Sequence, residues 1–211
     1  MANNKPGSLP RVLLCAALLA SLTASLGGCV AVMAGAAVQG AVATVDRRTL
    51  GAQTEDKAIS VKAETHLGSI VGDAGHVNVT SYNRKVLLTG EVRDEAMKRA
   101  VETEVRGVSN VESVINELQV AGPTSYTSRA SDTLITSKVK LSLADKKTIP
   151  ATAVKVVTEG GTVFLMGLVT QREGNIAADV AQGVSGVMRV VKVFEYISEE
   201  DLKALKPNGA Q

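Results

Sequence analysis

The 211-residue sequence has few aromatic residues: no tryptophan, three tyrosines and two phenylalanines. Stacking platforms for single-stranded nucleic acid need such rings, so this class of protein is nearly excluded. Two cysteines and two histidines leave little material for a zinc site. Removing residues 1–28, with Lys5 and Arg11, changes the balance from 23 basic and 21 acidic residues to 21 of each. A generally basic, nucleic-acid-binding protein is therefore not expected.

The first 28 residues have the layout of a secretory signal peptide. Lys5 and Arg11 precede an apolar run over residues 12–26, shorter than the roughly 20 residues that a membrane-spanning helix needs. The run ends in Leu26-Gly27-Gly28-Cys29, which resembles the lipobox of bacterial lipoproteins, where cleavage leaves an acylated cysteine as the first residue. An ordinary signal peptide with a chance cysteine is the alternative.

Acylation of Cys29 would anchor the chain firmly, because several acyl chains hold a protein where one gives only marginal binding. Cys15 would leave with the signal peptide, so no internal disulfide is expected. Val30, not Asp, follows Cys29, and by resemblance to lipoprotein sorting this implies the outer membrane, facing the periplasm. Residues 29–53 are predicted to form the lipidated cysteine and its tether, with a short docked helix as the alternative for residues 30–45.

An internal repeat determines the expected architecture. The segment VNVTSYNRKVLLTGEV at 77–92 matches VKVVTEGGTVFLMGLV at 154–169 with an offset of 77, and flanking blocks match with an offset of 76. Asp56 and Asp132 are one such flanking pair. We therefore predict two copies of one unit, over 54–121 and 131–198. A linker at 122–130 and a tail at 199–211 complete the chain.

The periodicity within each unit predicts the order α-β-β-α-β. Apolar residues recur at spacing four before residue 70, as on one face of a helix, and alternate in the strands that follow. Gly160-Gly161 is a strong signal for a two-residue hairpin turn, and Asn83-Arg84 occupies the same place in the first copy. Thr170 and Glu173 are spaced as a capping box at the start of the second helix.

Four glycines mark positions where the fold is expected to need them. Gly107 is predicted to end the second helix of its unit as a left-handed cap, with Gly183 at the same place in the second copy. Gly90 and Gly167 fall inside strands, which indicates a bulge or a close backbone approach.

The Val-x-Leu-x-Gly strand, the Gly-Val-x-x-Val turn and the order of elements resemble the BON domain. Two such units behind a lipobox, with Asp46-Arg47-Arg48 before the first unit and residues 163–169 in the second, look like the dual BON-domain lipoproteins of the Gram-negative outer membrane, the DolP group. The resemblance implies an α+β fold, in which two helices cover a three-stranded mixed sheet in each unit. It also implies phospholipid binding and a role in envelope integrity, without catalysis.

The first helix of the second unit carries the candidate lipid-binding site. Leu134 and Leu141 lie seven residues apart with Lys138 between them, on the face opposite the expected core stripe. Residues 122–197 have a net charge of +3, against −3 for residues 55–121, which favours an anionic partner such as phosphatidylglycerol or cardiolipin. Three further lysines are expected to approach the lipid phosphates: Lys140, Lys146 and Lys147.

Two other interpretations remain open for this helix. The leucines would be buried if they packed against the other unit or the tail. An adaptor for envelope-assembly proteins would use the same apolar face or an exposed sheet edge. A hydrolase is not expected, because no nucleophile elbow, phosphate loop or metal motif occurs, and His66 and His76 have no paired partner in sequence. An aromatic anchor near the start of the helix would favour lipid contact, but Leu134 stands there.

Overall fold

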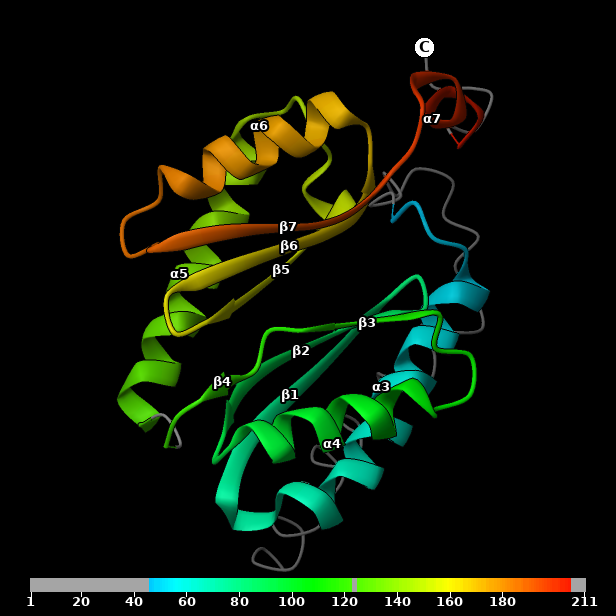
Figure 1. Ribbon diagram of the computed structural model, residues 1–211. Helices are drawn as coiled ribbons and strands as arrows, with labels where there is room; N and C mark the ends of the chain where they lie inside the picture. Colours follow the sequence, from blue (N-terminus) through cyan, green and yellow to red (C-terminus); the bar gives the residue numbers. More distant parts are fainter. Residues whose placement is uncertain (1–45, 123–124, 206–211) are drawn as a thin grey trace, which may run out of the picture. The chain divides into compact units, whose positions relative to one another are not determined.

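The computed structural model describes residues 46–122 and 125–205. These described residues belong to one compact unit. The predicted signal peptide, Cys29 and most of the predicted tether lie outside the described residues. In chain order the elements are α3 (Leu50–Val71), η1 (Gly72–Ala74), β1 (Gly75–Tyr82), β2 (Lys85–Val92), α4 (Glu95–Arg106), β3 (Ser113–Asn116), β4 (Gln119–Val120), α5 (Tyr126–Asp145), η2 (Ala151–Ala153), β5 (Val154–Glu159), β6 (Thr162–Val169), α6 (Gln171–Gln182), β7 (Arg189–Tyr196) and α7 (Glu199–Leu205) (Figure 1).

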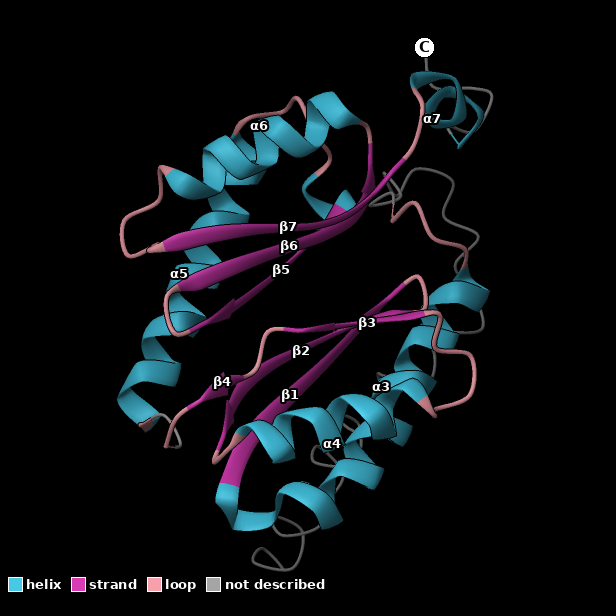
Figure 2. Ribbon diagram, viewed as in Figure 1, coloured by secondary structure: helices cyan, strands magenta, loops and turns pink. Residues whose placement is uncertain are grey.

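The predicted α+β fold is confirmed in both copies. In each domain an antiparallel hairpin, β1–β2 or β5–β6, adds the final strand in parallel to its second strand. Two helices lie on one face of each sheet, α3 and α4 in the first domain and α5 and α6 in the second (Figure 2). The helices bury the stripes that the spacing predicted, Ile59, Ala63 and Leu67 on α3 among them.

Both first helices begin earlier than the repeat predicted. Thr49 caps α3 and Ser125 caps α5, each accepting a hydrogen bond from the backbone N–H three residues on. Residues 50–53 are therefore helical rather than part of a tether, and residues 126–130 are helical rather than part of the linker. The reason is local, since a capping hydroxyl sets where a helix starts even when the neighbouring residues differ between the copies.

The final strand of the first domain is also different from its prediction. A single strand was expected there, but β3 and β4 are separate, and both pair with β2 in one unbroken register. The interruption lies opposite Gly90, whose φ of +113° departs from ordinary strand geometry. In the second domain β7 runs unbroken through the corresponding positions. Three acidic residues, Glu199, Glu200 and Asp201, form the first turn of a short helix, α7, within the segment predicted as a tail.

The two hairpin turns have the predicted geometry. Asn83 and Arg84 have positive φ angles of 49° and 65°, and Gly160 and Gly161 have 53° and 71°. A carboxylate from the preceding helix holds each turn. Asp56 accepts hydrogen bonds from the backbone N–H groups of Asn83 and Arg84, and Asp132 accepts from those of Gly160 and Gly161.

Gly107 and Gly183 are the C-caps of the second helices, as predicted, but the left-handed conformation predicted for them is wrong. Gly107 and Gly183 both have a φ of −77°, so they are right-handed and not left-handed caps. The backbone keeps right-handed angles at these two caps, and positive φ occurs three residues later, at Asn110 and Gly186. Gly90 and Gly167 instead reflect close backbone approach. A β-carbon built there would lie 2.0 Å from the His76 carbonyl oxygen and 2.4 Å from that of Ala153.

Each sheet also has an apolar face that its own helices do not cover. Along β2, Val86 and Leu88 belong to the helix-covered core, while Leu87 points to the opposite face. On β6, Phe164 is the repeat equivalent of Leu87, and Met166 lies two residues further along on the same face. Side chains from both domains form this third core: Tyr82, Leu87, Phe164, Met166 and Val193. The two sheets thus bury part of their apolar surface against each other.

The glycine geometry gives a first prediction. Gly90→Ala should lower the free energy of unfolding by about 3 kcal/mol or more, because a β-carbon adds both a backbone clash and an unfavourable φ. Gly183→Ala should change it by less than about 1 kcal/mol, since φ is ordinary and the nearest atom lies 3.6 Å away. Urea unfolding of both variants tests this, and an equally small effect at Gly90 would contradict it.

Candidate functional site

The outer face of α5 carries exposed leucines, as the sequence predicted. Leu134 and Leu141 are 63% and 68% exposed, and Lys138 is exposed between them. The opposite stripe of the helix, including Ile135 and Val139, is buried in the core of the second domain. The leucines therefore do not pack against the first domain, and that alternative for them is wrong. Such exposure of two large apolar side chains on one face is a feature of interaction surfaces.

The corresponding face of α3 lacks this combination. Its repeat-related residues are Ala58, Lys62 and Thr65, so only the lysine is shared. Lys62 and Thr65 are exposed, while Ala58 is partly covered. The two domains share a fold but only the second presents the apolar and basic pattern, which locates the candidate site on α5.

The structure divides the four predicted lysines among three environments. Lys138 and Lys146 line a groove of about 510 Å³ between α5 and α6. Lys140 lines a different pocket, because two residues along a helix correspond to a rotation of about 200°. Lys147 follows the end of α5 with a positive φ of 52°. The six predicted residues are all exposed, but they do not form one site.

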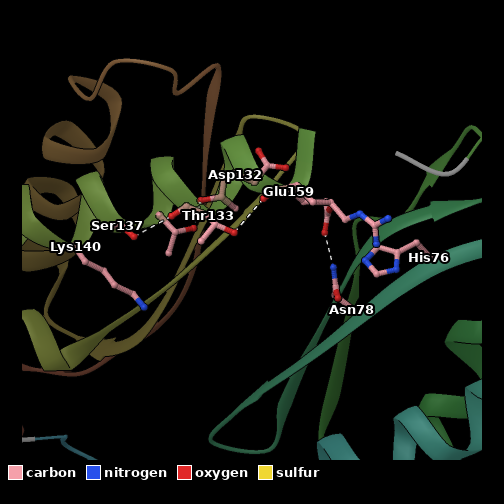
Figure 3. A pocket seen from close by; sticks show the side chains of 10 residues that line it. His76, Asn78, Asp132, Thr133, Ser137, Lys140 and Glu159 are labelled. Carbon is pink, nitrogen blue, oxygen red and sulfur yellow. Dashed lines mark hydrogen bonds between the residues drawn. The ribbon is translucent and has the colours of Figure 1, made fainter. Parts of the chain in front are cut away.

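The pocket beside Lys140 is polar and has a volume of about 450 Å³. Figure 3 shows hydroxyl-bearing side chains of α5 on one side and His76 and Asn78 of β1 on the other. Asn78 donates a hydrogen bond to Glu159 Oε2 at 2.7 Å, and this bond links the two domains. Burial raises the pKa of Glu159, and the nearby Glu91 carboxylate raises it further, against the opposing effect of Asn78.

Residues just before α3 fasten the two domains together. Arg47 makes a two-pronged ion pair with Glu173, with both N–O distances 2.7 Å and both side chains 4% exposed. The same guanidinium donates to the Leu168 carbonyl oxygen at 2.8 Å. The neighbouring Arg48 donates to Asp56 at 2.7 Å and stacks over the Tyr82 ring at 4.0 Å.

Glu173 also belongs to the predicted capping box, which is confirmed: Thr170 and Glu173 accept hydrogen bonds from each other's backbone N–H. Burial alone would raise the pKa of Glu173, but the hydrogen bonds from Arg47 and from the Thr170 N–H lower it below its ordinary value. Arg47 and Glu173 each belong to a motif that is visible in the sequence, but no local pattern pairs them. They are 126 positions apart, and only the folded chain brings them together.

The described residues were compared with the requirements of a metal site and of a membrane-spanning helix. Within 46–122 and 125–205, no three or more His, Cys, Asp or Glu side chains are placed to hold a metal ion. No helix in these ranges has the length and apolar character that crossing a bilayer requires. Cys29, the predicted lipidation site, lies outside them.

Comparison with known proteins agrees with the repeat. The BON domain model matches residues 55–122 and 131–198. The chain is 41% identical over 184 residues to Outer membrane lipoprotein DolP of Haemophilus influenzae, covering 86% of this chain and 95% of that protein. It is 31% identical to the 21 kDa hemolysin of Actinobacillus pleuropneumoniae, covering 72% of this chain and 80% of the hemolysin.

A third relative is Osmotically-inducible protein Y of Escherichia coli, at 31% identity over 64% of this chain and 70% of that protein. Among solved structures, CdsD of the Chlamydia trachomatis type III secretion system has 13% identity and a TM-score of 0.29, over 72% of this chain and 99% of that one. That likeness is too low to inform the fold.

The ion pair between Arg47 and Glu173 gives a second prediction. Arg47→Met should destabilise the protein by about 3–5 kcal/mol, because it leaves the Glu173 carboxylate buried without its partner. Arg93→Met, which removes an exposed pair with Asp94, should have a much smaller effect on stability, because water screens this pair. Chemical denaturation at pH 7 measures both, and equal losses would contradict a special role for Arg47.

Because the pKa of Glu173 is lowered in the folded state, this residue makes the protein less stable as the pH falls. The ion pair stabilises the fold above the ordinary glutamate pKa of about 4.5, and this stabilisation is lost as the pH falls through the lower pKa of the folded state. Stability measured between pH 7 and pH 3 should therefore fall less steeply in Arg47→Met than in the unchanged protein.

Glu159 gives a third prediction with the opposite sign. Its pKa is raised in the folded state, so its charged form weakens the fold as the pH rises through that value. Glu159→Gln should raise the free energy of unfolding at pH 7 by less than about 1 kcal/mol, and the gain should vanish below about pH 4. Glu64→Gln, at an exposed position on α3, should leave stability unchanged at both pH values. A loss of stability in Glu159→Gln at pH 7 would contradict the prediction.

Proposed function

The chain belongs to the BON-domain family as a protein with two such domains, and we propose that it is an outer-membrane lipoprotein that binds acidic phospholipids through α5. The protein with which it shares 41% identity is named an outer membrane lipoprotein. Acylation at Cys29 would hold the protein at the membrane, facing the periplasm. The role is one of binding and placement that supports envelope integrity, not of catalysis.

The observation that carries the proposal is the exposed pair Leu134 and Leu141 with Lys138 between them. Transfer of two leucines from water to the acyl region contributes on the order of 3–5 kcal/mol. The long stem of Lys138 lies along the same face, so its ammonium group reaches the phosphate level while its methylenes stay with the acyl chains. The net charge of +3 in residues 122–197 adds attraction to an acidic surface.

The lipid anchor and α5 would act together. Once the acyl chains hold the protein at a bilayer, binding by α5 becomes an intramolecular event, so that a weak site suffices. A weak site is what leucine at position 134 leads us to expect. Leucine lacks the preference of tryptophan and tyrosine for the headgroup level, so it holds the helix at the interface less firmly. The acyl chains would thus anchor the protein in any bilayer. Binding by α5 would then keep the protein at places in the membrane where acidic lipids are enriched.

Vesicle co-sedimentation tests the function with the compact unit from Thr44 onward, which lacks the anchor. It should bind phosphatidylglycerol or cardiolipin vesicles more tightly than phosphatidylcholine vesicles. Leu134→Asp and Leu141→Asp should each weaken binding to acidic vesicles at least tenfold, because each removes an inserting side chain and adds a repelled charge. The expected preference should also weaken with added salt.

Val61→Asp provides the matched control, since Val61 is 62% exposed on α3, the corresponding helix of the first domain. It should bind like the unchanged protein. If the unchanged protein ignores all vesicles, or if Val61→Asp loses binding as strongly as Leu134→Asp, the proposal is wrong. The first of these results would favour the alternative of an adaptor that binds envelope-assembly proteins.

A further inference from the structure

At the place in the first domain that corresponds to the groove between α5 and α6, a side-chain contact connects the two helices. Between α3 and α4, His66 Nδ1 lies 2.9 Å from Glu104 Oε1, and this contact joins the two helices. The repeat relates His66 to Ser142 and Glu104 to Val180. Ser142 and Val180 cannot make such a contact, and both line the open groove of the second domain. Equivalent positions therefore form a side-chain bridge in the first domain and part of the lining of a groove in the second.

The α5 wall of this groove is basic and rich in hydrogen-bond donors. Lys138, Ser142 and Lys146 follow one another at intervals of four residues, which places them along one stripe of the helix. The residue related to Lys146 in the first domain is Ile70, which packs on the core there. Among the described residues, no ion pair neutralises Lys138 or Lys146. Two unpaired ammonium groups with a hydroxyl between them match the charge and the acceptor oxygens of a phosphodiester.

The opposite wall adds one acceptor and one further hydroxyl. Asp179 lies in the last turn of α6, and Ser185 lies in the loop that follows. With two lysines and one aspartate, the groove keeps a net charge of +1, so it still favours an anion. A bare phosphate monoester has no use for the Asp179 carboxylate and is repelled by it. A phosphate that carries a glycerol hydroxyl can donate a hydrogen bond to it.

The groove adjoins the exposed leucines. Lys138 belongs to both features, since it lines the groove and lies between Leu134 and Leu141 on the outer face. On a helix, Lys138 is rotated by about 40° from Leu134, and Ser142 by about 100° from Leu141. A lipid with its acyl chains at the leucines would therefore have its phosphate at the groove entrance.

We propose that the groove between α5 and α6 is a headgroup site for phosphoglycerol lipids in a membrane. Lys138 and Lys146 bind the phosphate, Ser142 and Ser185 donate hydrogen bonds, and Asp179 accepts one from a glycerol hydroxyl. This inference rests on the proposed function and adds to it the source of headgroup selectivity. The leucines provide affinity for the bilayer, and the groove decides which lipid is held.

The decisive variant transfers the bridge of the first domain into the second. Ser142→His combined with Val180→Glu should close the groove with a pair that the fold already accommodates between α3 and α4. We expect the preference for phosphatidylglycerol over phosphatidylcholine vesicles to fall at least tenfold, with binding to phosphatidylcholine little changed. Gln171→Glu adds the same charge at the far, exposed end of α6 and should keep the preference.

A second comparison does not depend on helix packing. Lys146→Gln should weaken binding to phosphatidylglycerol vesicles about fivefold, whereas Lys147→Gln, an adjacent exposed lysine outside the groove, should weaken it by less than twofold. Equal losses in the two variants would mean general attraction to an acidic surface and would overturn the headgroup site.

Two further measurements define the ligand. Asp179→Asn should reduce the preference for phosphatidylglycerol over phosphatidic acid, because the acceptor for the glycerol hydroxyl is weakened and the repulsion of a bare phosphate is removed. Soluble glycerol 3-phosphate at millimolar concentration should not compete with the vesicles, and competition at micromolar concentration would overturn the assignment to a membrane lipid.

If lipid preference survives in the bridged variant while Leu134→Asp still abolishes binding, the groove proposal fails and the proposed function stands.

Discussion

The structure depends on the need to cover both faces of each sheet. The middle strands β2 and β6 carry apolar side chains on both sides, and two helices can cover only one of them. Leu87, Phe164 and Met166 are buried because the other domain supplies the missing cover. Unpaired, each domain would expose this face to water at a cost that grows with its apolar area. The two copies are thus joined by hydrophobic burial and not only by their linker.

The ionic contacts at this junction follow from the same constraint. Charges at a buried junction are tolerated only when they are paired and their hydrogen bonds are satisfied. Arg47 meets this condition through both oxygens of Glu173 and the Leu168 carbonyl, and Glu173 meets it through the capping box as well. The residues that enter the first domain are therefore fixed to the second.

The two copies keep their interior and differ on their surface. Asp56 and Asp132 hold equivalent turns in the same way, and the core stripes of α3 and α5 coincide. The outward positions have diverged, with leucines on α5 against alanine and threonine on α3, and with an open groove against a histidine–glutamate bridge. In a protein built from a repeat, residues that are alike in both copies are those that the shared fold requires. Exposed residues that differ between the copies are the candidates for a function of one copy alone.

The sequence by itself determined the repeated α-β-β-α-β order, the core stripes, the positive-φ turns and the capping box, because each depends on residues close together in the chain. It also singled out Leu134, Lys138 and Leu141, since helical periodicity states which side chains share a face. It misjudged Gly107 and Gly183, whose conformation depends on where the following loop turns. Only the tertiary structure decided that Arg47 pairs with Glu173, that the sheets share a core, and that α6 lies beside Lys138 and Lys146 to form a groove. These contacts join residues far apart in the chain, and their partners are set by packing, which no local pattern records.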